Sequence, residues 1–171
     1  HLGISVNISG RDLAQPDFVE RVLRVLHRHG VASGRLTLEI TETVLMNRLD
    51  MARDAIARLR AVGVRLAIDD FGTGYSSLAY LGTLPVDCLK IDRSFVVAMD
   101  GGTEYVEIVR AVLSLGQALG KNVVAEGIET AEQLATLRRL GVPAGQGYLL
   151  SRPLRPEQVP ALLYAPAAMP A

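Results

Sequence analysis

The sequence is poor in cysteine, in net charge and in long apolar runs, and each shortage excludes a class of protein. The single cysteine, Cys88, cannot form an internal disulfide, which favours a reducing compartment. Lys plus Arg balance Asp plus Glu at 18 each, so no general attraction to DNA or to a membrane surface is expected. No apolar run is long enough to cross a bilayer, and no signal peptide is recognisable. We therefore predict a cytoplasmic segment that contacts neither DNA nor membrane.

The chain also lacks a long linker and a low-complexity segment. Its 171 residues can bury a substantial core, so we expect one domain over residues 1–164. Residues 165–171 are small and Pro-rich and are expected to form a flexible tail. The first residue is His1 and not methionine, so we expect a piece of a longer protein, and a membrane anchor elsewhere in that protein is left open.

Strand-like and helix-like patterns alternate six times along the chain. Strands are predicted at 2–9, 36–40, 64–68, 86–91, 122–126 and near 145–148. Helices are predicted at 17–29, 51–62, 77–82, 105–119, 131–140 and after Pro156. This alternation indicates an α/β fold with a parallel sheet. Periodicity alone leaves open an incomplete (β/α)8 barrel and an open, doubly wound sheet.

Single residues mark several of the expected helix boundaries. Gly63 and Gly120 follow helical patterns and are expected to end those helices. Thr130 and Gln133 have the spacing of a capping box at the start of the helix 131–140. A serine at 76 or 77 is expected to cap the short helix 77–82.

Two adjacent carboxylates, Asp69 and Asp70, directly follow the third predicted strand and precede a glycine-rich turn. Neighbouring carboxylates repel each other unless a positive charge lies between them, and a divalent cation commonly supplies it. The simpler alternative is an Asp-Asp turn that carries a helix cap. The segment Gly72-Thr73-Gly74 lacks the lysine of a phosphate-binding loop, so we interpret it as a shaped turn.

Polar residues also stand at the C-terminal ends of the other predicted strands, the edge at which parallel α/β proteins build their active sites. The full set is Asn7, Glu39, Asp69, Asp70, Lys90, Asp92, Glu126 and Gln146. Charges on an ordinary solvated surface would be spread over loops and helix faces. Strand alternation places Lys90 and Asp92 on one face, where the alternative to a site is a structural ion pair.

The candidate ligands are hard oxygen atoms, with no cluster of histidine and cysteine among them. Such donors favour Mg2+ or Mn2+ over zinc. His27 and His29 lie in a helical pattern with basic neighbours and are expected at the surface. Cys88 is expected to be a small core residue, because no histidine is evidently placed to activate it as a nucleophile.

Six motifs in order carry a resemblance to a known family. They are Val6–Ser9, Glu39–Glu42, Asp69–Leu78, Leu84–Asp92, Ala125–Thr130 and Gln146–Pro153. On these residues the sequence resembles the EAL-domain family of cyclic di-GMP phosphodiesterases over essentially the whole chain except the tail. The resemblance implies a modified TIM barrel with one antiparallel strand. It also implies metal-dependent hydrolysis of cyclic di-GMP to linear pGpG in bacterial second-messenger signalling.

The resemblance further implies a two-metal site and a role for each matching residue. One metal would be held by Asn7, Glu39 and Asp69, and a second by Asp69, Asp70 and Glu126. The catalytic residues would be Lys90, which positions the attacking water, together with Asp92 beside it and Glu126. Glu42 would hold the loop 71–77 from beneath, and Glu129 and Gln146 would lie around the metals and substrate.

One departure from the family pattern bears on the expected activity. The Glu-Ala-Leu motif is absent, because the chain starts at what resembles the third strand, leaving about six of eight βα units. A ligand glutamate, a substrate-site arginine and two strands would be missing, and six strands cannot close a barrel. We expect poor activity from the isolated chain and an unpaired edge at Ile4–Ile8 that promotes self-association.

The expected partners are cyclic di-GMP, a second copy of the chain in a homodimer, and an upstream sensory or GGDEF-type domain. A cyclic di-GMP receptor or regulatory module that binds without cleaving is the alternative function. Degenerate receptors would be expected to lose ligands such as Asp69 or Asp70, which this chain keeps. An unrelated metal-dependent barrel enzyme, such as an aldolase, is a third and weaker option.

Overall fold

A computed structural model describes residues 2–47, 49–74 and 78–164, and its strands form one parallel sheet. The strands are β1 (Ile4–Asn7), β2 (Leu36–Thr41), β3 (Arg65–Phe71), β4 (Cys88–Ile91), β5 (Asn122–Ala125) and β6 (Ala144–Gly145). Each strand pairs in parallel with the next one in the chain, in the order β1-β2-β3-β4-β5-β6. A doubly wound sheet reverses its strand order at one point, and this sheet does not. The fold is therefore an incomplete TIM-like barrel.

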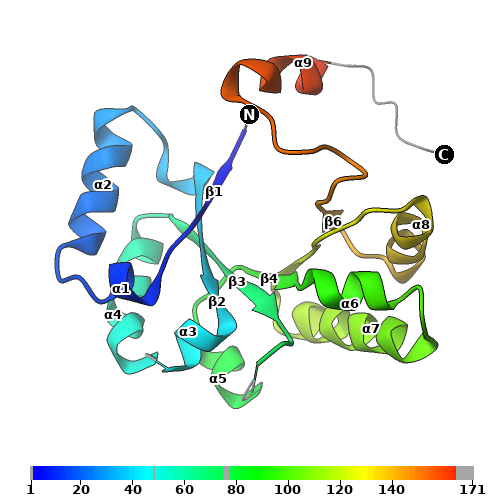
Figure 1. Ribbon diagram of the computed structural model, residues 1–171. Coiled ribbons are helices and arrows are strands. Elements are labelled where there is room, and N and C mark those ends of the chain that lie inside the picture. The colour runs from blue at the N-terminus through cyan, green and yellow to red at the C-terminus, as the bar shows by residue number, and fades with distance from the viewer. Residues whose placement is uncertain (1, 48, 75–77, 165–171) are drawn as a thin grey trace.

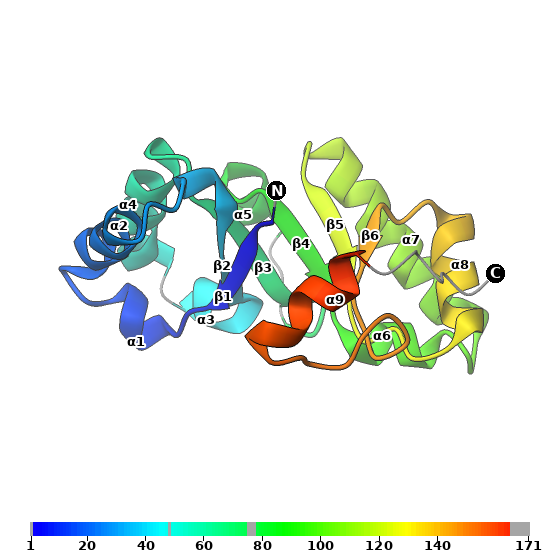
Figure 2. The ribbon, with the colours of Figure 1, turned by 90° about the horizontal axis from the view of Figure 1, so that it is seen from above.

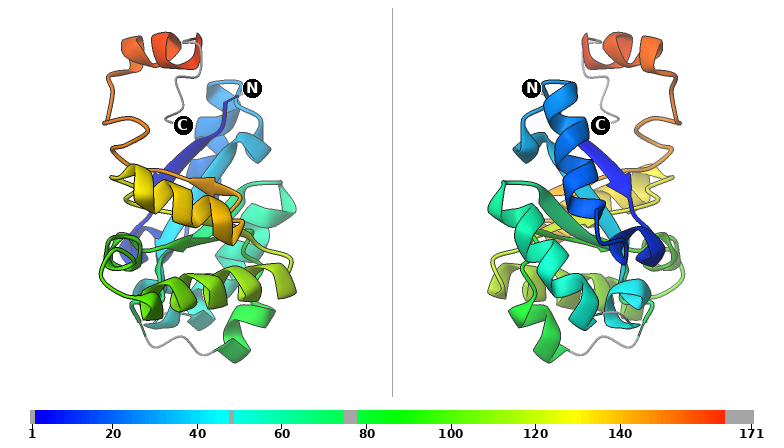
Figure 3. Two further views of the ribbon diagram at one scale, coloured as in Figure 1. Left: turned by 90° about the vertical axis from the view of Figure 1, so that its right-hand side faces the viewer. Right: turned by 90° about the vertical axis from the view of Figure 1, so that its left-hand side faces the viewer.

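The helices before β6 connect the strands and lie outside the curved sheet, and α9 follows the last strand (Figures 1 and 2). The helices are α1 (Gly10–Leu13), α2 (Phe18–Arg28), α3 (Glu42–Asn47), α4 (Leu49–Ala61), α5 (Leu78–Thr83), α6 (Arg93–Ala98), α7 (Thr103–Ala118), α8 (Ala131–Leu140) and α9 (Val159–Tyr164). Short 3-10 turns cover Ser33–Arg35 and Pro156–Gln158. Figure 3 shows α9 at the end of a segment that extends away from the sheet.

The core lies between the outer face of the sheet and the helices. Successive side chains of a strand point to opposite faces, so every second residue of β2, β3 and β4 faces the helices. The outward residues are apolar and less than 4% exposed: Leu38, Ile40, Leu66, Ile68, Leu89 and Ile91. They join helix residues such as Ile56, Leu59 and Val109 in one cluster. The other set of strand residues, which includes Glu39 and Lys90, is thereby left to face the inside of the curve.

Several predicted boundaries are confirmed. Gly63 and Gly120 follow α4 and α7 with φ of 90° and 63°, a left-handed conformation that glycine adopts without strain. The capping box of Thr130 and Gln133 opens α8. The expected serine cap at 76 or 77 and the tail 165–171 lie outside the described residues.

Other boundaries differ from the predictions. The fourth strand begins at Cys88 and not at 86, and the last strand covers only Ala144–Gly145 and not 145–148. Three short helices directly after strands, α1, α3 and α6, were not predicted, because each is too short to show a helical period. The antiparallel strand that the resemblance implies is not among the described strands.

The strands β1 and β6 are the two edges of the described sheet. All four residues of β1 are exposed, with Ile4 at 59% and Val6 at 42%. An apolar groove of about 420 Å³ lies between β1 and α2, lined by residues such as Phe18 and Val22. Among the described residues, no helix combines the length and apolarity that a membrane span needs.

This exposed edge predicts that the chain self-associates. Unpaired backbone groups and apolar side chains on an edge strand favour pairing with another chain, and a lysine on the edge opposes it. Sedimentation velocity of residues 1–171 should show concentration-dependent species larger than a monomer, and Ile4→Lys should shift them toward the monomer. The matched control is Ile108→Lys, which changes a 38% exposed isoleucine on α7 and should leave the distribution unchanged. A monomer at all concentrations in the unaltered chain would contradict the prediction.

Candidate metal site

One buried cation lies among three carboxylates at the C-terminal edge of the sheet. The Nζ atom of Lys90 on β4 is 2.5 Å from Glu39 Oε2 and 3.0 Å from Asp69 Oδ1. It is also 2.5 Å from Oε1 of Glu126, which follows β5. The Lys90 side chain is only 6% exposed. Four neighbouring strands or strand ends thus bring their polar residues to a single point.

Burial and hydrogen bonding act in opposite directions on these groups. Burial by itself lowers the pKa of Lys90, but hydrogen bonds to Glu126, Glu39 and Asp69 outweigh it and raise the pKa above the usual value. Burial raises the pKa of Glu126, and the hydrogen bond from Lys90 offsets part of that rise. Lys90 therefore stays protonated and balances part of the negative charge.

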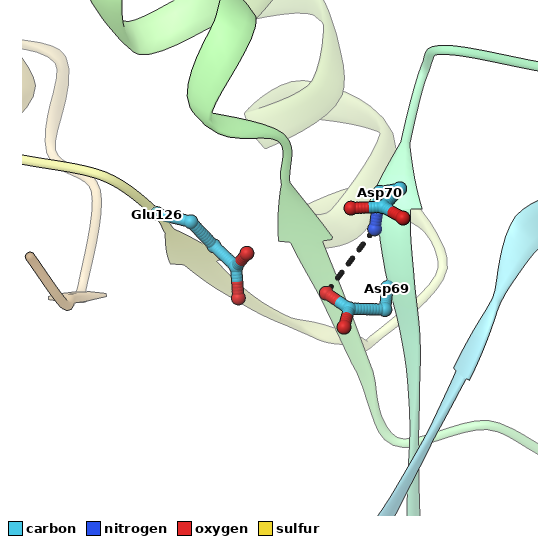
Figure 4. Close-up of side chains that lie close together, drawn as sticks. All are labelled: Asp69, Asp70 and Glu126. Atoms are coloured by element: carbon cyan, nitrogen blue, oxygen red, sulfur yellow. Dashed lines mark hydrogen bonds between the residues drawn. The ribbon is translucent and has the colours of Figure 1, made fainter. Parts of the chain in front are cut away.

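A second group of carboxylates could hold a metal ion. Oxygen atoms of Asp69, Asp70 and Glu126 all lie within 4.8 Å of one another. Figure 4 shows the three carboxylates facing the same space, two of them from β3 and one from the end of β5. Oxygen donors in this number and charge suit Mg2+ or Mn2+, so the residues present fit a hard divalent cation.

A local irregularity explains how two adjacent residues reach the same space. Neighbouring residues of a regular strand point to opposite faces. The pairing of β3 with β4 shifts register between Ile68 and Phe71, and Asp70 has a φ of 52°. Such a bulge redirects a side chain, and aspartate tolerates the left-handed region better than most residues. Asp70 N–H also donates to Asp69 Oδ1 at 3.2 Å.

Asp92 lies next to Asp70 and caps α6. Its Oδ1 accepts a hydrogen bond from the backbone N–H of Ser94 at 2.9 Å. Burial raises the pKa of Asp92, but hydrogen bonds from Ser94, Arg93 and Asp70 outweigh burial and lower it. Burial and the negative charges of Asp69 and Asp92 raise the pKa of Asp70. The surroundings of Asp70, like those of Glu126, therefore oppose its ionisation.

Glu42 supports the turn that follows β3. It is the first residue of α3 and is only 1% exposed. Its side chain is therefore buried and is not a solvated charge at the start of a helix. Its Oε2 accepts from the backbone N–H of Gly72 at 2.9 Å. A Cβ added to Gly74 would lie 3.2 Å from the Glu42 carboxyl group, so the turn passes close over this side chain. Residues 75–77 of the same loop lie outside the described part.

The remaining predicted residues are less closely gathered. Gln146 Nε2 donates to Glu126 Oε1 at 2.9 Å, which places it at the carboxylates. Glu129 instead pairs with Arg93 at 2.6 Å. Asn7 is exposed on the edge strand and stands opposite Glu39 in the register of β1 and β2.

A cavity of about 480 Å³ runs along the inner face of the sheet below this site. Its lining includes Glu39, Lys90 and Gln146 near the site and Arg65 and Cys88 farther along. Burial raises the pKa of the Cys88 thiol to about 11, so the thiolate needed of a nucleophile is scarce at neutral pH. The prediction that Cys88 is a small core residue is wrong, because Cys88 is half-buried and lines this cavity on the inner face of the sheet.

Two polar residues near the site were not predicted from the sequence. Arg93 pairs with Glu129, and its position directly after the strand-end residue Asp92 was a signal that could have identified it. Gln133 was predicted only as a capping residue, yet it is 3% exposed and also bonds Asp100. No sequence signal indicates that second contact, because 33 residues separate the two partners.

Comparison with known proteins places the chain among relatives with a common domain. The family model described as "EAL domain" matches residues 1–153. The chain is 46% identical over 153 residues to cyclic di-GMP phosphodiesterase NbdA of Pseudomonas aeruginosa, covering 90% of this chain and 20% of that protein. It is 43% identical over 156 residues to the bifunctional diguanylate cyclase/cyclic di-GMP phosphodiesterase MucR of the same organism, covering 91% and 23%. The chain thus spans between about a fifth and just over a quarter of the length of the curated relatives it matches.

Solved structures agree with these relatives. The PaMucR phosphodiesterase in complex with c-di-GMP has a TM-score of 0.88 at 43% identity, covering 92% of this chain and 64% of that one. The EAL domain of Mycobacterium smegmatis DcpA has a TM-score of 0.88 at 43% identity, covering 94% and 72%. Klebsiella pneumoniae BlrP1 in a manganese and c-di-GMP complex has a TM-score of 0.84 at 35% identity, covering 88% and 39%.

The raised pKa of Asp70 predicts that removing its charge stabilises the metal-free protein. A carboxyl group whose pKa is raised on folding loses stabilising effect as the pH rises through that pKa. In EDTA at neutral pH, Asp70→Asn should therefore raise the Tm. The gain should shrink as the pH falls and should vanish well below the ordinary aspartate pKa of about 3.9, where the carboxyl group is neutral in both states. Asparagine tolerates the positive φ, so the substitution adds no backbone strain.

Thermal unfolding with and without Mn2+ checks this expectation. Mn2+ should stabilise the unaltered chain more than the Asp70→Asn chain, because the variant lacks one ligand charge. The matched control is Asp54→Asn on the exposed surface of α4, which should change neither the Tm in EDTA nor the response to Mn2+. A lower Tm for Asp70→Asn in EDTA at neutral pH would contradict the electrostatic account.

Proposed function

The chain belongs to the EAL domain family, and we propose that it hydrolyses one phosphodiester bond of cyclic di-GMP to give linear pGpG. The observation that carries the proposal is the convergence of Asp69, Asp70 and Glu126 around a shared space beside Lys90. Relatives 46% and 37% identical to the chain are named cyclic di-GMP phosphodiesterases. A solved neighbour with 43% identity, the PaMucR phosphodiesterase, is a complex with c-di-GMP.

The proposal includes two divalent ions, Mg2+ or Mn2+, at the carboxylates. Asp69, Asp70 and Glu126 would hold one ion, and Asn7, Glu39 and Asp69 would hold the other. When bound, such ions activate water and neutralise the charge that develops on the phosphoryl group. The first ion is supported by the spacing of the oxygen atoms of Asp69, Asp70 and Glu126, and metal binding in general by neighbours solved as manganese and calcium complexes.

Lys90 would position the attacking water and stabilise negative charge near it. Its Nζ is already held by Glu39, Asp69 and Glu126, so the ammonium group needs little reorganisation to act. Asp92 would act beside it through its contact with Asp70. In this arrangement the protein's main contribution is a fixed set of charges at one edge of the sheet.

The supporting residues would keep those charges in place. Gln146 holds Glu126 by its side-chain amide, and Glu129 is anchored by Arg93 near the proposed substrate position. Glu42 fixes the backbone of the turn after Asp70 through Gly72. Hydrogen bonds to a ligand's surroundings orient it and commonly matter for metal affinity.

The proposal also covers partners and location. An upstream sensory or GGDEF-type domain is supported by the short share of the relatives that the chain spans and by one relative's name, which includes a diguanylate cyclase. A homodimer and a cytoplasmic location follow the expectations drawn from the sequence. A receptor that binds cyclic di-GMP without cleaving it is the alternative that the following experiment must separate.

Removing one ligand charge should nearly abolish hydrolysis. In the longest available form of the protein, Asp69→Asn or Glu39→Gln should lower kcat by roughly 100-fold or more, because metal ions contribute several kcal/mol of charge stabilisation. Chromatography of pGpG formed from cyclic di-GMP in Mg2+ or Mn2+ measures this. The exposed surface variants Asp54→Asn and Glu132→Gln provide matched charge-removal controls and should retain activity.

Two outcomes would contradict the assignment. Near-normal turnover by either ligand variant would rule out the two-metal site. Tight binding of cyclic di-GMP by the unaltered protein, with no pGpG formed in either metal, would favour the receptor.

The position of Glu42 predicts an effect on activity without loss of the fold. Glu42→Ala removes the acceptor for Gly72 N–H and should lower kcat by roughly tenfold, the lower end of effects seen for groups that orient metal ligands. Glu42→Gln keeps an acceptor oxygen and should retain more activity. Circular dichroism establishes that both variants are folded. Unchanged kcat and metal affinity in Glu42→Ala would show that the turn does not depend on this side chain.

A further inference from the structure

We propose that Gln133 is a positioning residue of the site, acting through Asp100 to hold the segment after β5 against the end of α6. Four polar or charged residues are buried among the described residues: Glu39, Glu42, Lys90 and Gln133. The first three belong to the site described above. The fourth, Gln133, is 3% exposed and lies outside that site, and a polar side chain buried to this extent needs hydrogen-bond partners.

Both ends of the Gln133 side-chain amide are used. The Oε1 atom accepts from the backbone N–H groups of Glu129 at 2.8 Å and Thr130 at 3.2 Å. The Nε2 atom donates to Asp100 Oδ2 at 2.8 Å. Asp100 lies just beyond α6, in the connection to α7.

Helix capping explains only half of this arrangement. The third helical residue of a capping box accepts a hydrogen bond from the backbone of the cap residue, and glutamate serves as well as glutamine. The donor Nε2 has no part in the cap. A glutamate at this position would place a second carboxylate against Asp100, so the amide nitrogen is what the contact with α6 requires.

The segment held by Gln133 carries two residues of the proposed site. It runs from Glu126 to Thr130, and its middle is fixed by Ile128 N–H, which donates to the backbone oxygen of Gln146 at 3.1 Å. Gly127 has a φ of 67°, and a Cβ there would lie 2.1 Å from Arg93 Cγ, so the segment passes directly against α6.

Contacts at both ends of α6 therefore tie this segment to the helix. At the start of α6, Arg93 pairs with Glu129 at 2.6 Å, and beyond its end Asp100 bonds Gln133. The cap residue of α6 is Asp92, which lies next to Asp70 on β3. Gln133 thereby links the position of Glu126, after β5, to the position of Asp70, near the end of β3. The separation of these two carboxylates is what a shared metal ion requires.

The inference rests on the proposed function, and exchanging the polarity of the hydrogen bond tests it. Gln133→Glu keeps the acceptor for Glu129 and Thr130 but places a carboxylate against Asp100. Asp100→Asn by itself keeps an acceptor oxygen for Gln133. The double variant Gln133→Glu with Asp100→Asn restores the bond in reverse, because the new amide can donate to the new carboxylate.

Two readouts on the full chain are expected to follow this pattern. Calorimetry should show Mn2+ affinity about threefold to tenfold weaker in Gln133→Glu, below the range usual for direct partners of a ligand, and restored to within about twofold in the double variant. Amide signals of Ser94 and Glu126 in 1H–15N spectra should shift in Gln133→Glu and return in the double variant.

A control separates positioning from general loss of stability. Lys121→Met removes two hydrogen bonds, to the backbone oxygens of Leu84 and Val86, at the opposite end of β5. It should lower the Tm and leave Mn2+ affinity unchanged. Gln133→Glu should weaken Mn2+ binding even if its Tm is no lower than that of Lys121→Met.

The outcomes distinguish this inference from the proposed function. Unchanged Ser94 and Glu126 signals in Gln133→Glu, or no recovery in the double variant, would overturn the positioning role. Unchanged Mn2+ affinity in Gln133→Glu would do the same. Absence of any Mn2+ binding by the unaltered chain would contradict the proposed function, while the amide signals would still decide whether Gln133 links the segment to α6.

Discussion

The crowding of carboxylates at one edge of a parallel sheet is the constraint on which the rest of the structure depends. Glu39, Asp69 and Glu126 surround a single ammonium group, Lys90, at distances of 2.5 to 3.0 Å. Buried like charges are tolerated only when compensated, and one cation does not neutralise this set. The raised pKa of Asp70, which burial and its neighbours Asp69 and Asp92 cause, expresses the remaining excess of negative charge. This excess of negative charge favours the binding of cations at the site.

Strand alternation makes such crowding compatible with a stable fold. The same strands that present Glu39 and Lys90 to the inside place Ile40, Leu89 and Ile91 in the core outside. Burial of the outer face against the helices supplies the stability, and the inner face is left to carry polar groups. The polar residues of the site and the apolar residues of the core therefore come from the same short strands. The geometry of the site is thus coupled to the packing of the helices.

Connections outside the strands then set the distances between the carboxylates. The turn after β3 is held by Glu42, and the segment after β5 is held by Gln133 and by Arg93 on α6. Buried hydrogen bonds are stiff because an unmade bond leaves a desolvated polar group. The two connections are thus fixed to helices, and the candidate metal-binding residues next to them are held in place as well.

The sequence by itself determined the parallel α/β class, the strand ends at which the polar residues gather, and the presence of two adjacent carboxylates, Asp69 and Asp70, at one of them. These features are local, since the pattern of apolar and polar residues within a short segment predicts both a strand and its end. The tertiary structure decided the rest. Only the register shift and the positive φ at Asp70 show that both adjacent carboxylates reach Glu126. The continuous strand order selects the barrel over the doubly wound sheet.

The contacts that local pattern could not predict join residues far apart in the chain. Glu129 pairs with Arg93, and Gln133 bonds Asp100, across 36 and 33 residues respectively. Such pairs depend on how α6 and α8 pack on the sheet, and many arrangements of the same helices would satisfy their amphipathic patterns equally well. Hydrophobic periodicity specifies which face of an element is buried, but not which polar group on a neighbouring element it will meet.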